Sequence, residues 1–349
     1  MDQGQPPAAI PLEALRPLGQ GLNRPECVLA HSLGLVFASD WSGSGGVSVV
    51  APNGDVAFIQ AKNAPRPMRP NGIALEPGGR FLLADLGTEF GGVWRLYPDG
   101  MVEPVVTEIE SRPLPPTNFV FRDSRGRLWI TVSTCQVPRH LGCRSDVADG
   151  FIALTDSQGT RIVADGLGYT NECLLSPEED YLYVNETFAR RLSRFPVSSG
   201  GSLGKRETIA EFSHGTFPDG LTFDAEGAVW LTSIVSNRVL RIDRNRKIDV
   251  IIEDFDPAHI AWVEQAFAAG ELGRPHLDRI AGRRLKNISS LAFGGGDLRT
   301  GYLGCLLGDS IFTFESPVTG HPLPHWNAPL GPLASLFATD PAQQNGNIA

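Results

Sequence analysis

One short phrase recurs six times along the chain, and its second residue nearly always carries a side-chain oxygen. The residues at this place, which we call position two, are Glu26, Asn71, Asn118, Asn171, Asp219 and Ser289. Carboxylate and amide oxygens are the ligands that hard divalent cations prefer. If the fold brings these positions to one point, the sequence predicts a site for such a cation and for the chemistry it supports.

The spacing of the phrase predicts the elements that must position these residues. Successive copies are roughly 45–53 residues apart, with a longer gap before the sixth, and periods of about 40–50 residues are typical of propeller blades. Each copy reads as an apolar strand, a turn and a second strand. Two further strands follow most copies around turn signals such as Pro52-Asn53-Gly54 and Asp99-Gly100. The sequence therefore predicts an all-β fold, a six-bladed β-propeller with four-stranded antiparallel blades, as a single domain over residues 1–349.

The sixth repeat is incomplete, which bears on how the ring closes. It offers only residues 310–314 as a clear third strand, while a spare strand at residues 15–19 precedes the first phrase. We expect this N-terminal strand to supply the missing fourth strand and to close the ring, since closure hides both sheet edges.

Two long connections are predicted to lie on the same face as position two. We call the four strands of a blade A to D in chain order. In this topology the D–A and B–C loops share that face, and the A–B and C–D turns lie on the opposite one. The long connections are the B–C loop of blade 3, about residues 133–149, and an insertion before blade 6, about residues 254–287.

The insertion carries a helix signal. Asp256 suits the N-cap, Pro257 the first helical position and Gly270 the stop. An apolar stripe at helical spacing consists of Ile260, Val263 and Phe267. We expect a small helical cap over the mouth of the ring.

The bulk composition excludes several classes of function. The formal net charge is −9 and there is no basic run, which argues against nucleic acid or an anionic membrane as the main partner. No apolar stretch approaches the ~18 residues of a membrane span, and the first residues lack a signal-peptide pattern. We therefore expect a cytoplasmic protein with reduced thiols, in which Cys135 and Cys143 are the one pair that could bridge a loop. The oligomeric state is left open.

Four of the position-two residues form the predicted metal shell. They are Glu26, Asn118, Asn171 and Asp219. Two carboxylates and two amide carbonyls suit Ca²⁺, which takes about six to eight oxygen ligands, while Mg²⁺, Mn²⁺ and Zn²⁺ stay open. We expect Asn71 to be structural or to support the shell, and Ser289 to be a spectator.

Other residues are candidates for contacting a substrate. They are Trp41, Asn71, Arg139, His140, Glu172, His214 and Trp262. Glu172 follows position two, so strand alternation is expected to turn its carboxylate away from the channel, which favours a structural role. Aromatic residues in the cap favour a substrate larger or less polar than an aldonolactone.

The phrases resemble the gluconolactonase/senescence-marker-protein (regucalcin-like) family of six-bladed propellers. The resemblance rests on Pro25-Glu26, Pro70-Asn71-Gly72, Thr117-Asn118, Thr170-Asn171 and Pro218-Asp219-Gly220, and on Phe293-Gly294-Gly295 in blade 6. It implies that Glu26, Asn171 and Asp219 bind a divalent cation and that Asn118 ligates the cation or contacts substrate. The chain departs from the family at Asn118-Phe119, at Asn171-Glu172 and in the larger insertion before blade 6.

The sequence thus predicts a metal-dependent lactonase acting on a small-molecule lactone or ester. Asp219 is the first choice for positioning or deprotonating the attacking water, and Asn118 for holding the carbonyl or ring oxygen. One alternative is an aryl-ester or phosphotriester hydrolase on the same metal site. Others are a non-catalytic calcium-binding propeller and a non-hydrolytic enzyme on this scaffold.

Overall fold

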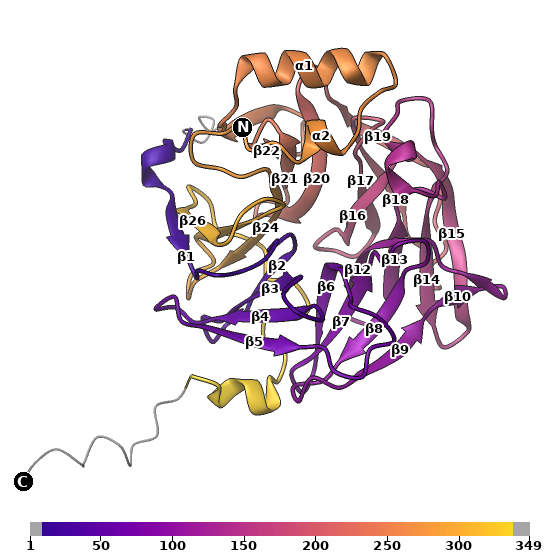
Figure 1. The fold of residues 1–349 in the computed structure, drawn as a ribbon, viewed down its shortest axis with the longest axis vertical. Helices are drawn as coiled ribbons and strands as arrows, with labels where there is room; N and C mark the ends of the chain where they lie inside the picture. Colours follow the sequence, from indigo (N-terminus) through magenta and orange to yellow (C-terminus); the bar gives the residue numbers. More distant parts are fainter. Residues whose placement is uncertain (1–8, 338–349) are drawn as a thin grey trace, which may run out of the picture.

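Six four-stranded antiparallel sheets are arranged as the blades of a ring in the computed structural model, which describes residues 9–337 (Figure 1). This confirms the predicted six-bladed propeller. The innermost strand of each blade, strand A, begins at or near the repeated phrase. The A strands are β2 (Val28–Ala30), β6 (Pro70–Glu76), β12 (Thr117–Arg122), β16 (Thr170–Leu175), β20 (Thr216–Phe223) and β24 (Ile288–Gly294).

The remaining strands follow outward in each blade. The B strands are β3 (Val36–Asp40), β7 (Arg80–Asp85), β13 (Leu128–Val132), β17 (Tyr181–Glu186), β21 (Val229–Val235) and β25 (Thr300–Cys305). The C strands are β4 (Gly46–Val50), β8 (Gly92–Leu96), β14 (Gly150–Asp156), β18 (Arg191–Pro196), β22 (Arg238–Ile242) and β26 (Ile311–Glu315). The outermost D strands are β5 (Val56–Gln60), β9 (Val102–Val106), β15 (Gly159–Leu167), β19 (Glu207–Glu211), β23 (Ile248–Ile252) and β1 (Arg16–Leu18). A small hairpin, β10 (Glu108–Ile109) with β11 (Arg112–Pro113), follows β9.

The N-terminal strand closes the ring as the sequence predicts. β1 pairs antiparallel with β26, with Arg16 opposite Thr313 and Leu18 opposite Ile311. Pro17 between them has no N–H to donate, and it is tolerated because β1 is the outermost strand of its blade. Blade 6 is therefore built from both ends of the chain.

The A–B turns of blades 3 and 5 share a hydrogen bond between an aspartate of the turn and a tryptophan of the core. Asp123 accepts a hydrogen bond from the buried indole N–H of Trp129 at 3.0 Å, and Asp224 accepts one from that of Trp230 at 2.9 Å. The glycine at the tenth position of the phrase has positive φ in four copies, at Gly34, Gly79, Gly126 and Gly227. A residue in the left-handed region therefore follows strand A in each of these blades, where glycine is accommodated without strain.

The insertion before blade 6 contains the expected helix. α1 (Pro257–Ala268) begins after Asp256, whose Oδ1 accepts a hydrogen bond from the N–H of Ala258 at 2.9 Å, and Gly270 follows it with φ of 69°. The short helix α2 (Arg274–Leu277) comes next. The one-turn 3-10 helices are η1 (Leu12–Ala14), η2 (Arg139–Gly142) and η3 (Gly331–Ser335).

α1 packs on one face of the ring, over blades 4 and 5. Its buried Ile260 and Val263 share an apolar cluster with Phe188 and Phe217, and α1 lies beside the ends of β20 and β21 (Figure 1). This is the face of the B–C and D–A loops, which we call the mouth face. The helical cap is therefore on the predicted side of the molecule.

The opposite face carries a segment that the sequence pattern does not reveal. Residues 316–337, which we call the C-terminal strap, run across the A–B turns. The N–H of Ala225 donates to the carbonyl of Thr319 at 2.8 Å, and the N–H of Gly78 donates to that of Pro329 at 2.5 Å. The strap therefore spans from blade 5 to blade 2 on the side away from the mouth.

Candidate functional site

The A strands are irregular just where position two falls. Register shifts interrupt the A–B pairing between Pro70 and Ile73, Thr117 and Phe119, Thr170 and Cys173, Pro218 and Leu221, and Ile288 and Ser290. A β-bulge leaves an extra residue unpaired and re-aims its side chain. Position-two side chains from neighbouring blades consequently meet at the mouth end of the channel, as the next contacts show.

A chain of amide hydrogen bonds links blades 2, 3 and 4. Asn71 Nδ2 donates to Asn118 Oδ1 at 3.2 Å, and Asn118 Nδ2 donates to Asn171 Oδ1 at 2.7 Å. Asn171 Nδ2 in turn donates to Thr187 Oγ1 at 3.0 Å. All four side chains are buried. Asn118 and Asn171, two of the predicted metal ligands, are therefore in direct contact.

The two remaining position-two residues are supporting groups in their contacts. Asn71 also donates to the backbone carbonyl of Asn118 at 3.1 Å. Ser289 Oγ donates to the backbone carbonyl of Glu26 at 2.8 Å, which joins blade 6 to blade 1. The contacts of Asn71 agree with the expected supporting role, whereas Ser289, which was expected to be a spectator, ties the backbone of blade 6 to that of blade 1.

The two carboxylates of the predicted shell, Glu26 and Asp219, are buried and interact electrostatically. Burial, followed by the negative charge of Glu26, raises the pKa of Asp219 well above its usual value, against the opposing charges of Arg139 and Arg24 and a hydrogen bond from Asn171. Glu26 is paired with Arg24, whose Nε and Nη2 each lie 2.9 Å from Glu26 Oε2. The structure thus brings all four predicted ligands to one end of the channel, with two arginines beside them.

Arg139 lies in η2, in the long blade 3 loop, and its side chain reaches the position-two residue Asn118. Its guanidinium donates to Asn118 Oδ1 and, at 2.9 Å, to Ser133 Oγ. The guanidinium carbon lies 5.2 Å from the centre of the Tyr169 ring, within the range of a cation–π contact. The loop predicted to carry specificity groups therefore does contact a position-two residue.

Trp41 lies at the mouth between blades 1 and 2. Its indole N–H donates to the carbonyl of Pro70 at 2.8 Å. The guanidinium carbons of Arg24 and Arg69 lie 4.5 and 5.7 Å from its ring centre. Trp41 thus contacts Arg24, the partner of Glu26, which is compatible with a place in the wall of the site.

The other candidate residues in loops have no described contact with the position-two side chains. Trp262 is 39% exposed and its ring centre lies 4.2 Å from that of His276. His214 is exposed, with Nδ1 3.8 Å from a carboxylate oxygen of Glu264. His140 is exposed and lines a cleft of about 520 Å³ between the blade 3 loop and the insertion. A substrate role for these three residues stays a prediction, because none has a described contact with position two.

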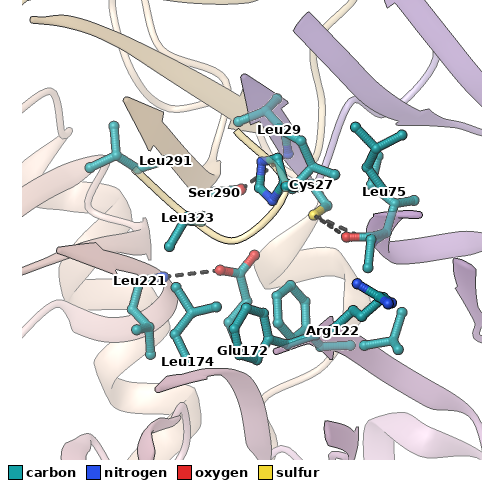
Figure 2. Close-up of a pocket in the computed structure, with 17 residues that line it drawn as sticks. Cys27, Leu29, Leu75, Arg122, Glu172, Leu174, Leu221, Ser290, Leu291 and Leu323 are labelled. Carbon is teal, nitrogen blue, oxygen red and sulfur yellow. Dashed lines mark hydrogen bonds between the residues drawn. The ribbon is translucent and has the colours of Figure 1, made fainter. Parts of the chain in front are cut away.

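Glu172 corrects an expectation. Its carboxylate points into a closed pocket of about 30 Å³ in the channel, where Oε2 accepts the N–H of Leu221 at 3.0 Å (Figure 2). The expected alternation that would turn Glu172 away from the channel is wrong, because the bulge between Thr170 and Cys173 interrupts it. Burial raises the pKa of Glu172 well above the usual value, and the nearby charges of Asp219 and Glu26 add to this effect.

The pocket below position two is closed by the C-terminal strap. Residues of all six A strands line it, including Cys27 and Ser290, and strap residues Leu323 and His325 complete it (Figure 2). A volume of 30 Å³ holds about two water molecules. The channel therefore narrows to a small, mostly apolar pocket beneath the mouth, into which a few polar groups such as Glu172 and Ser290 project.

The donor set fits a hard cation in chemical type. Two carboxylates and two amide oxygens converge, and the pKa of Asp219 is raised first by burial and then by the negative charge of Glu26, a repulsion that a cation would relieve. Residues 9–337 contain no group of three or more His, Cys, Asp or Glu side chains placed to hold a metal, so amide oxygens would have to complete the shell. A cation at Glu26 would also compete with Arg24.

Two contributors to the site were missed by sequence reasoning. Arg24 stands two residues before Glu26, and its charge beside a candidate ligand was the available signal. Thr187 lies in the B–C loop of blade 4 and has no sequence signature, because only the folded structure places it against Asn171. The five cysteines are free, so Cys135 and Cys143 form no bond.

The geometry can now be set beside known proteins. A family model described as SMP-30/Gluconolactonase/LRE-like region matches residues 25–261, which is more than half of the chain. The chain belongs to this family. The match confirms the resemblance seen in the repeated phrases.

Within residues 9–337, no helix is long and apolar enough to cross a membrane.

Curated members and relatives match over part of their length. A 6-deoxy-6-sulfogluconolactonase of Pseudomonas putida is 28% identical over 135 residues, covering 37% of this chain and 44% of that protein. The adipocyte plasma membrane-associated protein of Rattus norvegicus is 26% identical over 201 residues, covering 54% and 52%. The chain thus spans about half the length of these relatives.

Solved structures share the fold over nearly the whole chain. A gluconolactonase from Xanthomonas campestris has a TM-score of 0.64 at 19% identity, covering 90% of this chain and 96% of that one. A calcium-binding regucalcin from Agrobacterium tumefaciens has a TM-score of 0.62 at 17% identity, covering 90% and 94%. At such identities the likeness establishes the six-bladed architecture.

Proposed function

We propose that this chain is a divalent-cation-dependent lactonase, which opens a cyclic ester with an activated water molecule. The observation that carries the proposal is the convergence of Glu26, Asn118, Asn171 and Asp219 at one end of the channel. Membership of the family and the names of its lactone-hydrolysing relatives support the reaction class.

The cation would be held by carboxylate oxygens of Glu26 and Asp219 and by amide oxygens of Asn118 and Asn171. When bound, it would polarise the ester carbonyl and stabilise the developing negative charge. Ca²⁺ is our first choice because every proposed ligand is an oxygen and because a structural relative is described as calcium-binding. Mg²⁺, Mn²⁺ and Zn²⁺ are the alternatives.

Asp219 is the proposed base. Burial, and then the negative charge of Glu26, raises the pKa of Asp219, so its carboxylate binds a proton more readily than an ordinary aspartate does, as a general base must. A water held at an Asp219 carboxylate oxygen would give up its proton to that oxygen as it attacks the lactone carbonyl. The proton would then pass to the ring oxygen as the acyl–oxygen bond breaks, which gives the open hydroxy acid. No serine nucleophile is needed for this reaction.

Asn118 and Arg139 are the proposed groups for holding substrate. Asn118 lies between Asn71 and Asn171, so its amide is fixed by hydrogen bonds on both sides. The guanidinium of Arg139 lies against the same amide and can donate to a carbonyl or ring oxygen of the lactone. Buried position-two side chains exclude bulk water from this place.

A substrate panel with and without chelator tests the proposal. Purified protein is assayed against D-glucono-1,5-lactone, 4-nitrophenyl acetate and a phosphotriester, before and after treatment with EDTA and return of Ca²⁺. We expect lactone opening that EDTA abolishes and the cation restores. Greater activity on the aryl ester or phosphotriester would favour that hydrolase class instead.

Asp219→Ala links the reaction to this site. We expect the variant to lose cation binding by calorimetry and to lose lactone hydrolysis by a factor of at least about 10³. Glu89→Ala, which removes an exposed carboxylate from the same face, is the control and should keep both. Unchanged turnover in Asp219→Ala would refute the mechanism, and cation binding without hydrolysis in the wild type would indicate a non-catalytic calcium-binding propeller.

A further inference from the structure

Two buried polar atoms at the ring have no hydrogen-bond partner among the described residues. One is a donor, Arg139 Nε, and the other is an acceptor, Asn71 Oδ1. Both side chains are bonded through other atoms to the same oxygen, Asn118 Oδ1, so they are neighbours. Buried polar groups in folded proteins are nearly always satisfied by protein, water or ligand. An unpaired donor beside an unpaired acceptor therefore leaves a place where a water molecule or a polar ligand can bridge the two side chains.

Arg139, which is partly buried, differs from three buried arginines in its charge balance. Arg24, Arg127 and Arg241 each have a carboxylate oxygen within 2.6–2.9 Å. No carboxylate among residues 9–337 lies within 4.0 Å of Arg139, which contacts only Asn118, Ser133 and the Tyr169 ring. A guanidinium is held most strongly by an oxyanion, such as a carboxylate, at hydrogen-bond distance. Among the described residues Arg139 has no such partner, and an anionic group of a ligand would supply it.

The two carboxylates of the ring do not forbid an anionic ligand. The charge of Glu26 is offset by Arg24 at 2.9 Å, and Arg139 offsets Asp219 at longer range. The formal charges of these four side chains cancel, which leaves the carboxylate of Glu172, in the pocket beneath, as the remaining negative charge that a bound cation would offset. Arg69, which lies over the outer side of Trp41, adds a further positive charge at the mouth.

We propose that the substrate of this site is a hydroxylated lactone that carries an anionic group, a carboxylate or a sulfonate. Arg139 holds the anion, and Asn71 Oδ1 accepts a hydrogen bond from a hydroxyl of the same molecule. The inference rests on the proposed function for the lactone part, whereas the recognition of the anion depends only on Arg139 and its surroundings.

Matched lactones test the inference. The probes are D-glucono-1,4-lactone, which is neutral, D-glucaro-1,4-lactone, which carries a carboxylate, and the 1,4-lactone of 6-deoxy-6-sulfo-D-gluconate, which carries a sulfonate. We expect kcat/KM to be at least tenfold higher for one of the anionic probes, and the better of the two identifies the anion. δ-Valerolactone, which lacks hydroxyls, should be the poorest substrate.

Variants at Arg139 assign the preference to this side chain. Arg139→Gln should lower the ratio of kcat/KM for the anionic to the neutral lactone at least tenfold, and Arg139→Lys should lower it less. Arg144→Gln is the control, because Arg144 lies on the same loop but is exposed and paired with Asp146 at 2.7 Å. It should leave the ratio unchanged.

A binding measurement separates this inference from the proposed function. Calorimetry in EDTA with D-glucarate and the neutral polyol D-glucitol, neither of which is hydrolysed, should show at least tenfold tighter binding of glucarate, and Arg139→Gln should remove the difference. If no lactone is opened but this difference is found, the proposed function fails and the anion site stands. If lactones are opened without charge preference, or if Arg139→Gln changes both probes by the same factor, the anion site is overturned.

Discussion

Thr187 is a single residue that orients two of the proposed metal ligands. Its buried hydroxyl accepts a hydrogen bond from Asn171 Nδ2 at 3.0 Å and donates one to the carbonyl of Pro218 at 2.8 Å. The first bond directs the other end of the Asn171 amide, Oδ1, toward Asn118. The second fixes the backbone just before Asp219. Thr187 is therefore a positioning residue for two proposed ligands at once.

Replacing Thr187 by valine keeps the shape and removes both hydrogen bonds. We expect Thr187→Val to weaken cation binding by about 10–100-fold, as is usual when a group that orients a ligand is lost. Calorimetric titration with Ca²⁺ measures this, and KM and kcat should be recorded separately. Thr187→Ser retains the hydroxyl and should recover most of the affinity. Equal affinities in the valine variant and the wild type would contradict the positioning role.

Glu172 gives the cation-free protein a pH-dependent stability. Its pKa in the folded state is raised, first by burial, so the folded state binds this proton more tightly than the unfolded state does. Its contribution is thus fully present below the ordinary Glu pKa of about 4.3 and is lost as the pH rises through the higher folded value. Each unit of elevation corresponds to about 1.4 kcal/mol.

Glu172→Gln removes this titration and leaves an amide oxygen to accept the N–H of Leu221. We expect the variant to be more stable than the wild type by at least about 1 kcal/mol at pH 8, with the difference shrinking toward pH 4.5. Urea unfolding in EDTA at both pH values measures it. Glu178→Gln, at an exposed carboxylate, is the control. A difference that does not change with pH would exclude Glu172 as its source.

At the scale of elements, the period of the chain predicted the strands, but not how the strands present their side chains. The repeat spacing and the Asn-Gly turns were sufficient for six blades, and Asp256 with Pro257 located α1. Strand alternation misplaced Glu172, because the bulges in the A strands depend on pairing between β16 and β17. The reach of Arg139 to Asn118 likewise depends on a loop fold that has no periodic signal.

The insertion is held by a few contacts that can be tested one at a time. Ile260 is 4% exposed and packs in the cluster beneath α1, so Ile260→Ala should cost about 2–4 kcal/mol locally. We expect hydrogen exchange to accelerate in residues of α1 more than in the blades. Gln265→Ala, on the exposed side of the same helix, should change little. Uniform acceleration through all blades would show instead that the insertion unfolds with the ring.

At the scale of the whole molecule, the ring is held shut by the segment around β1. Leu15 is fully buried in the core of blade 6, beside Ile288 and Leu303. We expect Leu15→Ala to lower the free energy of unfolding by about 2–4 kcal/mol, since it leaves a cavity next to the closing strand. Denaturant unfolding monitored by tryptophan fluorescence measures the loss. Glu13→Ala, at an exposed neighbour, is the control, and equal midpoints for the two variants would argue against a closing role.

The pairing of β1 with β26 also sets a timetable for biosynthesis. Arg16 meets its partner Thr313 across 297 residues of chain. At ribosomal rates of about 5–20 residues per second, the first strand is made roughly 15–60 s before the strand it must join. Blades 1 to 5 can form from contiguous sequence during that interval, while blade 6 cannot. During this interval the nascent chain is an incomplete propeller in which β1 has no partner strand. Chaperone binding would then protect the unpaired strand most.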